Sequence, residues 1–524
     1  MKVKRALISV SDKTGLEDLV KTLAGMGVEI LSTGGTAKFI RSLGVKVAEV
    51  SDYTGSPEIM DGRVKTLHPK IHGALLALRD NREHMAEAKK HGIIPIDMVV
   101  VNLYPFAKTV AQKTVKLEEA VENIDIGGPS MLRSAAKNFV SVAVLSDPTD
   151  YPEVIEELKR TSGSLSEESL SKLAAKTFKR TSEYDSLISG YLSGISAGAS
   201  GAKQSVFPDK LALEFEKIED LRYGENPHQK AAFYRNSEKS SAASLTKAKK
   251  LHGKDLSFNN IMDLDAALDI VSEFDEPAAC IIKHATPCGV ALGKDLKSAF
   301  QDALDCDKLS AFGGIIGLNK ALDEKTAIAI AEAGFIECII APSYDKKGLE
   351  ALTKKKNLRL MEAGDIKSAA SGREYNFKKL RGGALFQEVD AQDAAKKDLK
   401  CVTKKRPTTD ELDSLYFAWK VVKHVKSNAI VISRDKKTVG IGAGQTSRID
   451  SVIIAINKAG ERARNAVLAS EAFFPKADSI EAAAKAGICA IIQPGGSIAD
   501  QEIIDAADKF GISMVFTLIR HFSA

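Results

Sequence analysis

The sequence predicts an α/β fold that is divided among more than one domain. The first 150 residues alternate short apolar runs with stretches of helical periodicity, the pattern of a parallel sheet with helices on both faces. A run of small residues at 193–202 has no periodicity and predicts a linker. Two more stretches of mixed helix and strand follow, and 524 residues are too many for one hydrophobic core.

The elements of the N-terminal part are predicted from its apolar runs. Short runs predict strands at 4–10, 28–31, 45–50, 97–103 and 140–145. Apolar residues spaced by three and four predict helices at 16–26, 36–43 and about 152–192.

The domain boundaries follow from the linker and from a charged segment near residue 390. We expect one domain at 1–195 and a second region at 203–524, which divides into subdomains at 203–390 and 391–524. The two subdomains contain loosely similar elements, but no sequence repeat between them is strong enough to recognise.

The composition narrows the classes of function. A net charge of +5 is mild for this length and favours anionic small molecules over nucleic acid, which needs a concentrated basic face. The six cysteines form no C-x-x-C pair, so neither a disulfide framework nor a zinc site is expected. No signal peptide opens the chain, and no apolar run approaches about 18 residues. We therefore expect a cytoplasmic protein without a membrane segment, a nucleic-acid partner or a metal.

The segment Ser32-Thr33-Gly34-Gly35-Thr36 joins a predicted strand to a predicted helix. Its glycines let backbone N–H groups point into the turn, its hydroxyls add donors, and the helix N-terminus that follows favours negative charge. These properties suit a phosphate, although the same residues would also make a plain tight turn.

Polar residues also follow the neighbouring strands. Ser9, Ser11 and Lys13 lie at the end of the first strand, and Asn102 and Tyr104 at the end of the fourth. Because the carboxyl ends of parallel strands meet at one edge, we expect these groups to face one ligand. The G-x-G-x-x-G motif of a dinucleotide fold is absent after the first strand.

Ionisable residues gather in other loops of the same domain. Arg63 and Lys65 alternate in one loop and share a side if it is extended. Asp125 precedes a Gly-Gly pair, and Lys137 follows two alanines. Each group alone could be a solvated loop, but their occurrence together favours a site.

Lys283 and His284 end the short apolar run 278–282, which predicts a buried strand. A histidine titrates near neutrality, and partial burial lowers the pKa of a lysine, so this pair suits proton transfer at the edge of a sheet. The alternative is a lysine that snorkels and a histidine that caps a turn.

Six motifs of the N-terminal part carry a family resemblance: SVSDKTGL, STGGTA, GRVKTLHP, NLYPF, IDIGG and AAKN. In this order they resemble the inosine monophosphate (IMP) cyclohydrolase domain of the bifunctional purine-biosynthesis family, which has a methylglyoxal-synthase-like fold. The resemblance implies cofactor-free closure of the purine ring on a formylated carboxamide ribonucleotide (FAICAR), with loss of water. It assigns the 5′-phosphate to Lys13, Ser32, Gly35, Thr36 and Arg63. From their places at the strand ends and in the turn, we expect Ser9, Ser11, Thr33 and Asn102 to bind the substrate too. The resemblance assigns the ring-closing chemistry to Lys65, Tyr104, Asp125 and Lys137.

The rest of the chain resembles the formyltransferase domain of the same family. The motifs are RYGENPHQ, LSFNN, the Lys-His pair, SAFGG, SNAIV, GIGAGQTSR, EAFFP and the terminal RHF. The implied fold is cytidine-deaminase-like, in two subdomains and without zinc. The implied reaction moves a formyl group from 10-formyltetrahydrofolate, a cosubstrate, to the amine of the carboxamide ribonucleotide AICAR.

The resemblance also implies roles for residues of this second region. His284 would be the base, Lys283 would stabilise the oxyanion or donate to the departing folate nitrogen, and Asn428 would join them in catalysis. The nucleotide would be bound by Arg222, Tyr223, Asn260, Gly313, Arg448 and Arg520. The folate would meet Phe312, Phe473 and Asp478. For Asn260, a helix cap is the simpler alternative.

The chain departs from the family pattern at two places. Ala524 stands where members commonly carry a further histidine, and Lys476-Ala477 differs within the EAFFP segment. The resemblance implies a homodimer with the transferase site at the subunit contact. Two other classes of function are alternatives. A nucleotide-binding sensor would not need Lys65, Asp125 and Lys137 together, and an NAD-dependent oxidoreductase would need a dinucleotide fingerprint that this sequence lacks.

Overall fold

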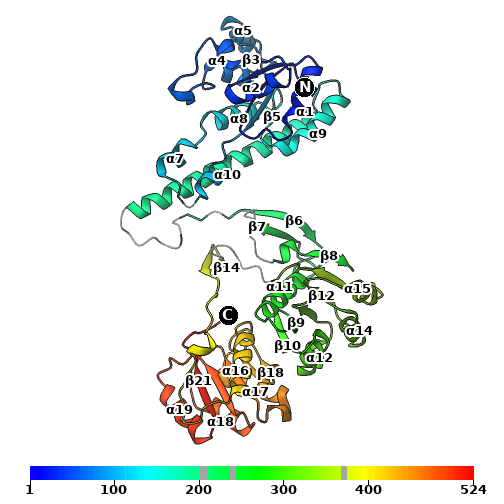
Figure 1. Cartoon of the computed structure of the whole chain (residues 1–524), viewed down its shortest axis with the longest axis vertical. Helices are drawn as coiled ribbons and strands as arrows, with labels where there is room; N and C mark the ends of the chain where they lie inside the picture. The colour runs from blue at the N-terminus through cyan, green and yellow to red at the C-terminus, as the bar shows by residue number, and fades with distance from the viewer. Residues whose placement is uncertain (113, 200–206, 208–209, 212, 237–243, 367–374) are drawn as a thin grey trace. The chain divides into compact units, whose positions relative to one another are not determined.

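The computed structural model divides the chain into two compact units, Met1–Leu211 and Ala212–Ala524 (Figure 1). It describes all residues except 113, 200–206, 208–209, 212, 237–243 and 367–374. The predicted linker at 193–202 is helical as far as Ala199, where α10 ends, and its last three residues lie outside the described part.

Unit 1 contains a five-stranded sheet in the order β3-β2-β1-β4-β5, and every strand pair in it is parallel. The strands are β1 (Arg5–Val10), β2 (Glu29–Ser32), β3 (Ala48–Glu49), β4 (Met98–Asn102) and β5 (Ala143–Leu145). The strand predicted at 45–50 is therefore reduced to two residues, because Val50 already begins a helix.

The helices of unit 1 cover both faces of this sheet. Along β1, Ala6 and Ile8 pack in one hydrophobic cluster, whereas Leu7 packs in another, as the alternation of a strand requires. The helices are α1 (Leu16–Gly25), α2 (Gly34–Ser42), α3 (Val50–Thr54), α4 (Pro69–Leu76), α5 (Arg82–Lys90), α6 (Phe106–Val110), α7 (Leu117–Glu122), α8 (Gly127–Lys137), α9 (Tyr151–Arg160) and α10 (Glu167–Ala199). This arrangement places the ends of β1, β2 and β4 along one edge.

Unit 2 is built on a 12-stranded mixed sheet and two separate hairpins, β6-β7 and β14-β15. The sheet order is β16-β21-β20-β19-β17-β18-β10-β9-β11-β12-β13-β8. The strands are β6 (Phe215–Leu221), β7 (Ala231–Asn236), β8 (Lys249–His252), β9 (Ala278–Lys283), β10 (Thr286–Leu292), β11 (Ile315–Leu318), β12 (Cys338–Ala341), β13 (Arg359–Glu362), β14 (Tyr375–Leu380), β15 (Gly383–Glu388), β16 (Lys400–Cys401), β17 (Ile430–Arg434), β18 (Lys437–Gly442), β19 (Val467–Ser470), β20 (Ala490–Gln493) and β21 (Ser513–Phe516).

The helices of unit 2 follow the same order in each half of the sheet, except that α13 has no α-helical counterpart in the second half. They are α11 (Phe258–Ser272), α12 (Leu296–Cys306), α13 (Lys308–Ala311), α14 (Glu324–Glu332), α15 (Lys346–Thr353), α16 (Thr409–Val422), α17 (Arg448–Ala459), α18 (Asp478–Lys485) and α19 (Asp500–Lys509). No helix in the described part of the chain is both long enough and apolar enough to span a bilayer.

The two halves of unit 2 are a structural repeat. The series β8-α11-β9-β10-α12-β11-α14-β12-α15-β13 corresponds to β16-α16-β17-β18-α17-β19-α18-β20-α19-β21, and the order of strands across the sheet is mirrored about its centre. Only loosely similar elements are recognisable in the sequence, because the two halves preserve the backbone geometry with different side chains.

Two glycine contacts mark equivalent positions of the repeat. A β-carbon at Gly289, the fourth residue of β10, would overlap the carbonyl oxygen of Ala303, the eighth residue of α12. A β-carbon at Gly440, the fourth residue of β18, would likewise overlap the carbonyl oxygen of Ala455, the eighth residue of α17. In both halves, the helix after the hairpin therefore crosses its strand at a point where only glycine fits.

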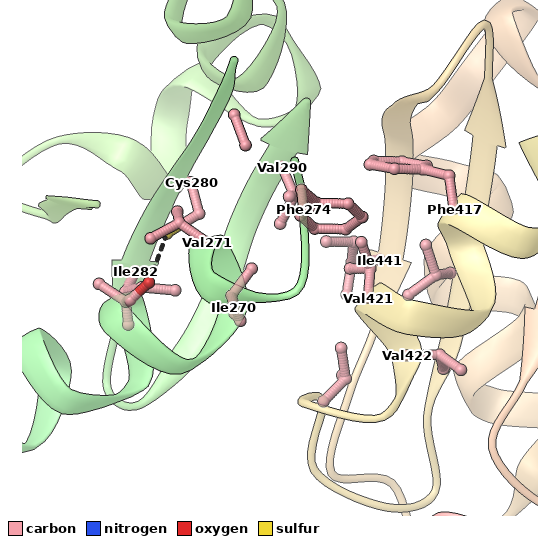
Figure 2. Packing of buried hydrophobic residues seen from close by; sticks show 14 of the residues in the cluster. Ile270, Val271, Phe274, Cys280, Ile282, Val290, Phe417, Val421, Val422 and Ile441 are labelled. Atoms are coloured by element: carbon pink, nitrogen blue, oxygen red, sulfur yellow. Dashed lines mark hydrogen bonds between the residues drawn. The ribbon is translucent and has the colours of Figure 1, made fainter. Parts of the chain in front are cut away.

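The seam between the halves is the junction of β10 and β18. These strands pair at Ala291 and Lys437, and the hydroxyl of Thr438 completes the junction: it accepts from the N–H of Val290 (2.9 Å) and donates to the same residue's carbonyl oxygen (3.1 Å). Beside them, Phe274 lies 5.5 Å from Phe417 between ring centroids, and Figure 2 shows these apolar side chains meeting from the two halves.

A half-buried ion cluster joins the two halves at the same seam. The carboxylate of Glu273, from the first half, contacts Lys423 (3.0 Å) and His424 (3.0 Å) of the second half. Burial alone would raise the pKa of Glu273, but the hydrogen bond to His424 and the charges of His424 and Lys423 outweigh it and lower the pKa to about 2. The carboxylate therefore stabilises the seam above the ordinary pKa of glutamate, and this contribution is lost as the pH falls toward 2.

The glycine contact in the second half predicts a large stability effect. Gly440→Ala forces β18 and α17 apart and should lower the free energy of unfolding of unit 2 by about 3 kcal/mol. The measurement is urea unfolding followed by the fluorescence of Trp419, the single tryptophan of the chain, which is buried in the core of unit 2. Gly383→Ala is the control, because a β-carbon there meets nothing within 4 Å. Equal unfolding midpoints for the two variants would contradict the close approach.

Candidate functional site

The turn after β2 lies beside the end of β1 in unit 1. The hydroxyl of Ser32 donates to the carbonyl oxygen of Ile8 (2.6 Å), and the Thr36 hydroxyl accepts from the N–H of Val10 (3.1 Å) and donates to its carbonyl oxygen (3.0 Å). Both hydroxyls are buried and serve the frame of the turn. They therefore hold the exposed Gly34-Gly35 backbone at the N-terminus of α2 in a fixed position.

A second set of hydrogen bonds ties β1 to β4. The side-chain oxygen of Asn102 accepts from the N–H groups of Ser11 (2.6 Å) and Asp12 (2.9 Å), and its amide donates back to the carbonyl oxygen of Asp12 (2.9 Å). The hydroxyls of Ser9 and Thr33 are 3.2 Å apart. Asn102 therefore aligns the two strand ends, and its side chain is occupied by this task.

Asp125 is the most constrained ionisable group near this edge. Its carboxylate accepts from the N–H of Gly128 (2.7 Å), and its own N–H donates to the hydroxyl of Tyr184 (2.8 Å) on α10. Burial raises the pKa of Asp125, while the backbone N–H groups of Gly128 and Tyr104 and the charge of Lys65 oppose that rise in part. The structure therefore brings Asp125, Lys65 and Tyr104 together.

Lys65 has a further contact, and Arg63, Lys13 and Lys137 are the other charged residues predicted for unit 1. Lys65 lies 3.6 Å from Glu58, and the guanidinium of Arg63 contacts Glu122 in an exposed pair. The side chain of Lys13 is exposed after β1. Lys137 is the last residue of α8, about 16 Å along the helix from its start next to Asp125, at 1.5 Å per residue over 11 residues.

Lys283 and His284 lie where β9 turns into β10. The ammonium of Lys283 donates to the carbonyl oxygen of Phe312 (2.7 Å), whose ring is 63% exposed and packs on Phe335. Gly313 follows with φ +73° and donates its N–H to the carbonyl oxygen of Phe335 (2.8 Å). Phe312 and Gly313 are therefore neighbours of Lys283, and the exposed His284 is the next residue along the turn.

The backbone of this turn donates hydrogen bonds to an acidic side chain. The carboxylate of Asp263, on α11, accepts from the N–H groups of His284 (3.3 Å) and Ala285 (2.6 Å). Nearby, Asn260 is buried in a capping box with Ser257, and its amide donates to Glu337 (2.8 Å). The helix-cap interpretation of Asn260 thus describes its contacts in this structure.

Asn428 and Arg448 form one network in the second half of unit 2. The guanidinium of Arg448 donates to the side-chain oxygen of Asn428 (2.7 Å) and makes a double contact with Glu471 (2.5 and 3.0 Å). Arg448 and Glu471 are both buried, so the guanidinium contacts Asn428 from the interior of the protein. The backbone of Ala429 also donates to Glu471 (3.0 Å), which fixes the start of β17.

The other predicted residues of unit 2 lie near its surface. Arg222 donates to the hydroxyl of Tyr223 (2.8 Å) between β6 and β7, and Arg520 stacks on Phe522 near the C-terminus. Asp478 begins α18, and Phe473 is half-buried beside the core residue Phe474. Ala524 ends the chain, and its carbonyl oxygen accepts from Lys378 (2.8 Å).

Sequence reasoning missed three residues that hold predicted ones: Tyr184, Asp263 and Glu471. Tyr184 lies within a long helical stretch, and Asp263 lies among other acidic residues of one helix, so neither stands out by spacing. Glu471 begins the EAFFP motif, which is the one available signal. Within the described ranges, no cluster of three or more His, Cys, Asp or Glu side chains could hold a metal ion.

Known protein families and relatives match both parts of the chain. A family profile described as AICARFT/IMPCHase bienzyme matches residues 135–458, and an MGS-like domain profile matches residues 15–130. Two relatives, from Acetivibrio thermocellus and Bacillus subtilis, are each named "Bifunctional purine biosynthesis protein PurH". Both are 52% identical to this chain; the matches cover 99% of both sequences for the first and 100% of both for the second.

A third relative of the same name, from a Thermoanaerobacter species, is 54% identical, and the match covers 99% of each sequence. With a profile that matches more than half of the chain and relatives that match its whole length, this chain belongs to the AICARFT/IMPCHase bienzyme family.

Proposed function

We propose how this bifunctional enzyme of purine biosynthesis divides its two reactions. Unit 2 transfers a formyl group from 10-formyltetrahydrofolate to the 5-amino group of AICAR, and unit 1 closes the resulting FAICAR to IMP with loss of water. The observation that supports this division is that each unit contains its own group of ionisable side chains. These are Lys65 and Asp125 in unit 1, and Lys283 and His284 in unit 2.

In unit 1, the turn between β2 and α2 would hold the 5′-phosphate. Its backbone N–H groups and the N-terminus of α2 favour an anion, and Lys13 adds a positive charge at the neighbouring strand end. The purine ring would then lie toward Lys65, Tyr104 and Asp125. Ring closure needs a proton taken from the carboxamide nitrogen and a charge stabilised on the formyl oxygen, which a lysine and a buried carboxylate supply together.

In unit 2, the amine of AICAR attacks the formyl carbon as His284 takes its proton. The C–N bond to the folate then breaks, and the departing nitrogen takes up a proton. Lys283, held on the carbonyl oxygen of Phe312, is placed to stabilise the oxyanion that forms between these steps. Arg222, Tyr223 and Arg520 would bind the nucleotide, and Asn428 would be aimed at it by Arg448.

The folate would bind near apolar and acidic groups of both halves. The exposed ring of Phe312 offers a face for stacking on the pterin, and Phe473 and Asp478 lie in the second half after β19. These side chains suit a flat heteroaromatic ring with amide-like edges.

We also propose a homodimer formed through the two hairpins of unit 2. A two-stranded hairpin that belongs to no larger sheet is only marginally stable by itself, so these hairpins need a partner surface. They expose the apolar side chains of Phe215 (41%), Phe377 (46%) and Leu385 (59%). The rings of Phe215 and Phe377 lie 6.4 Å apart between centroids. An exposed apolar surface of this kind is typical of a protein interface.

Single substitutions should separate the two reactions. His284→Ala should lower formyl transfer about a hundredfold or more by removing the base, while supplied FAICAR is still cyclised at the normal rate. Lys65→Ala should do the reverse. Each reaction is assayed separately on purified enzyme.

Asp435→Ala is the matched control, because Asp435 holds the equivalent turn position in the other half of unit 2. It should leave both rates unchanged. If the His284→Ala variant transferred the formyl group at the normal rate, His284 would not be the base.

The dimer proposal predicts the effect of a charge on the hairpins. Phe377→Asp should convert the dimer to a monomer in sedimentation velocity and lower formyl transfer more than cyclisation. Ile498→Asp changes an exposed apolar residue outside the hairpins and should leave the assembly intact. If Phe377→Asp sediments like the unmodified enzyme, the hairpins are not the interface.

A further inference from the structure

Asp263 lies under the turn that carries His284. Its two carboxylate oxygens accept separate hydrogen bonds, from the N–H of His284 (3.3 Å) and from the N–H of Ala285 (2.6 Å). Asp263 comes from α11, whereas the turn joins β9 to β10. One side chain therefore connects a helix to the two residues that set the direction of the histidine.

This turn has an unfavourable backbone for its sequence. Lys283 pairs with Thr286, so the loop has two residues, His284 (φ 55°) and Ala285 (φ 54°). A two-residue hairpin loop with both residues in the left-handed region is a type I′ turn, which favours Asn-Gly or Asp-Gly. Each residue with a β-carbon in that region is strained, because the β-carbon approaches the following carbonyl oxygen. The carboxylate of Asp263 offsets this strain by binding both N–H groups.

The repeat supplies an internal comparison. In the second half, Asp435 (φ 53°) and Lys436 (φ 58°) form the same turn between β17 and β18. Asp263 is the sixth residue after the N-cap Ser257 of α11, and the sixth residue after the N-cap Thr408 of α16 is Ser414. Since the same hairpin forms over a serine, a carboxylate at this position is not a general requirement of the fold.

We propose that Asp263 is a positioning residue for formyl transfer, which holds the His284 backbone in its left-handed conformation and so directs the imidazole toward the substrate amine. This inference rests on the proposed role of His284. It concerns where the ring lies during reaction, because both hydrogen bonds that Asp263 makes to the turn go to backbone N–H groups.

The test begins with Asp263→Ala and the milder Asp263→Asn. The kcat of formyl transfer should fall about tenfold to a hundredfold in Asp263→Ala and less in Asp263→Asn, because a shifted base reacts poorly even when the substrate binds normally. The KM for AICAR and the rate of FAICAR cyclisation should not change. The fluorescence of Trp419 checks that unit 2 is folded, and Asp263→Asn serves if the alanine variant unfolds.

Two combined variants separate positioning from stability. In a His284→Ala background, Asp263→Ala should cause no further loss of formyl transfer, because its effect passes through the imidazole. In an Asp263→Ala background, Ala285→Gly should restore part of kcat, because glycine adopts the left-handed region without strain. Ser414→Ala is the matched control in the other half and should leave kcat unchanged.

The outcomes distinguish this inference from the proposed function. If His284→Ala is inactive in formyl transfer and folded Asp263→Ala has a normal kcat, the positioning role is wrong and the base assignment stands. If the losses from Asp263→Ala and His284→Ala multiply in the double variant, Asp263 acts independently of the imidazole and the inference also fails. If His284→Ala transfers formyl normally, the proposed function itself has failed.

Discussion

The junction of β10 and β18 is the constraint on which unit 2 depends. Each half of this unit contains its own hydrophobic clusters, and the strands of the two halves pair at Ala291 and Lys437. The hydroxyl of Thr438 makes two hydrogen bonds to the backbone of Val290 there. Because Lys283 and His284 belong to one half and Asn428 to the other, this junction sets their relative positions in the proposed transferase site.

The two halves of unit 2 share one backbone arrangement but carry different polar side chains at equivalent positions. The residue after β11 is Asn319, which accepts from the N–H of Ala278, and the residue after β19 is Glu471, which accepts from the N–H of Ala429. Replacement of a neutral amide by a carboxylate adds a buried charge, and Arg448 neutralises it. The proposed base and its proposed positioning residue lie where the halves diverge: His284 corresponds to Asp435 in the turns, and Asp263 corresponds to Ser414 on the helices beside them.

Much of the local structure could be predicted from the sequence because it depends on neighbouring residues. The apolar run at 278–282 predicted β9, which ends at Lys283, and the strand-to-helix segment from Ser32 to Thr36 forms the turn at the start of α2. The strand predicted at 45–50 was mostly wrong, since Val50 begins α3 and only Ala48 and Glu49 pair with β2.

The contacts that position the candidate residues could not be predicted in the same way. Tyr184 reaches Asp125 across 59 residues of sequence, and Glu471 reaches Arg448 across 23, so no local pattern links either pair. The resemblance assigns Arg448 to nucleotide binding, and in the structure its guanidinium is paired with the buried Glu471, because a buried carboxylate must be paired. The sequence identifies candidate polar and ionisable residues, and the tertiary contacts show which of them support another residue, as Arg448 supports Asn428.

The seam can be tested with one substitution that removes its central hydrogen bonds and preserves its shape. Thr438→Val leaves the N–H and carbonyl groups of Val290 unpaired at a buried position and should weaken the junction by about 2 kcal/mol. The measurement is the ratio of formyl transfer to FAICAR cyclisation in the same preparation, below the unfolding transition reported by Trp419. The account predicts that this ratio falls while cyclisation stays constant. An unchanged ratio in a measurably destabilised variant would show that formyl transfer does not depend on how the two halves are joined.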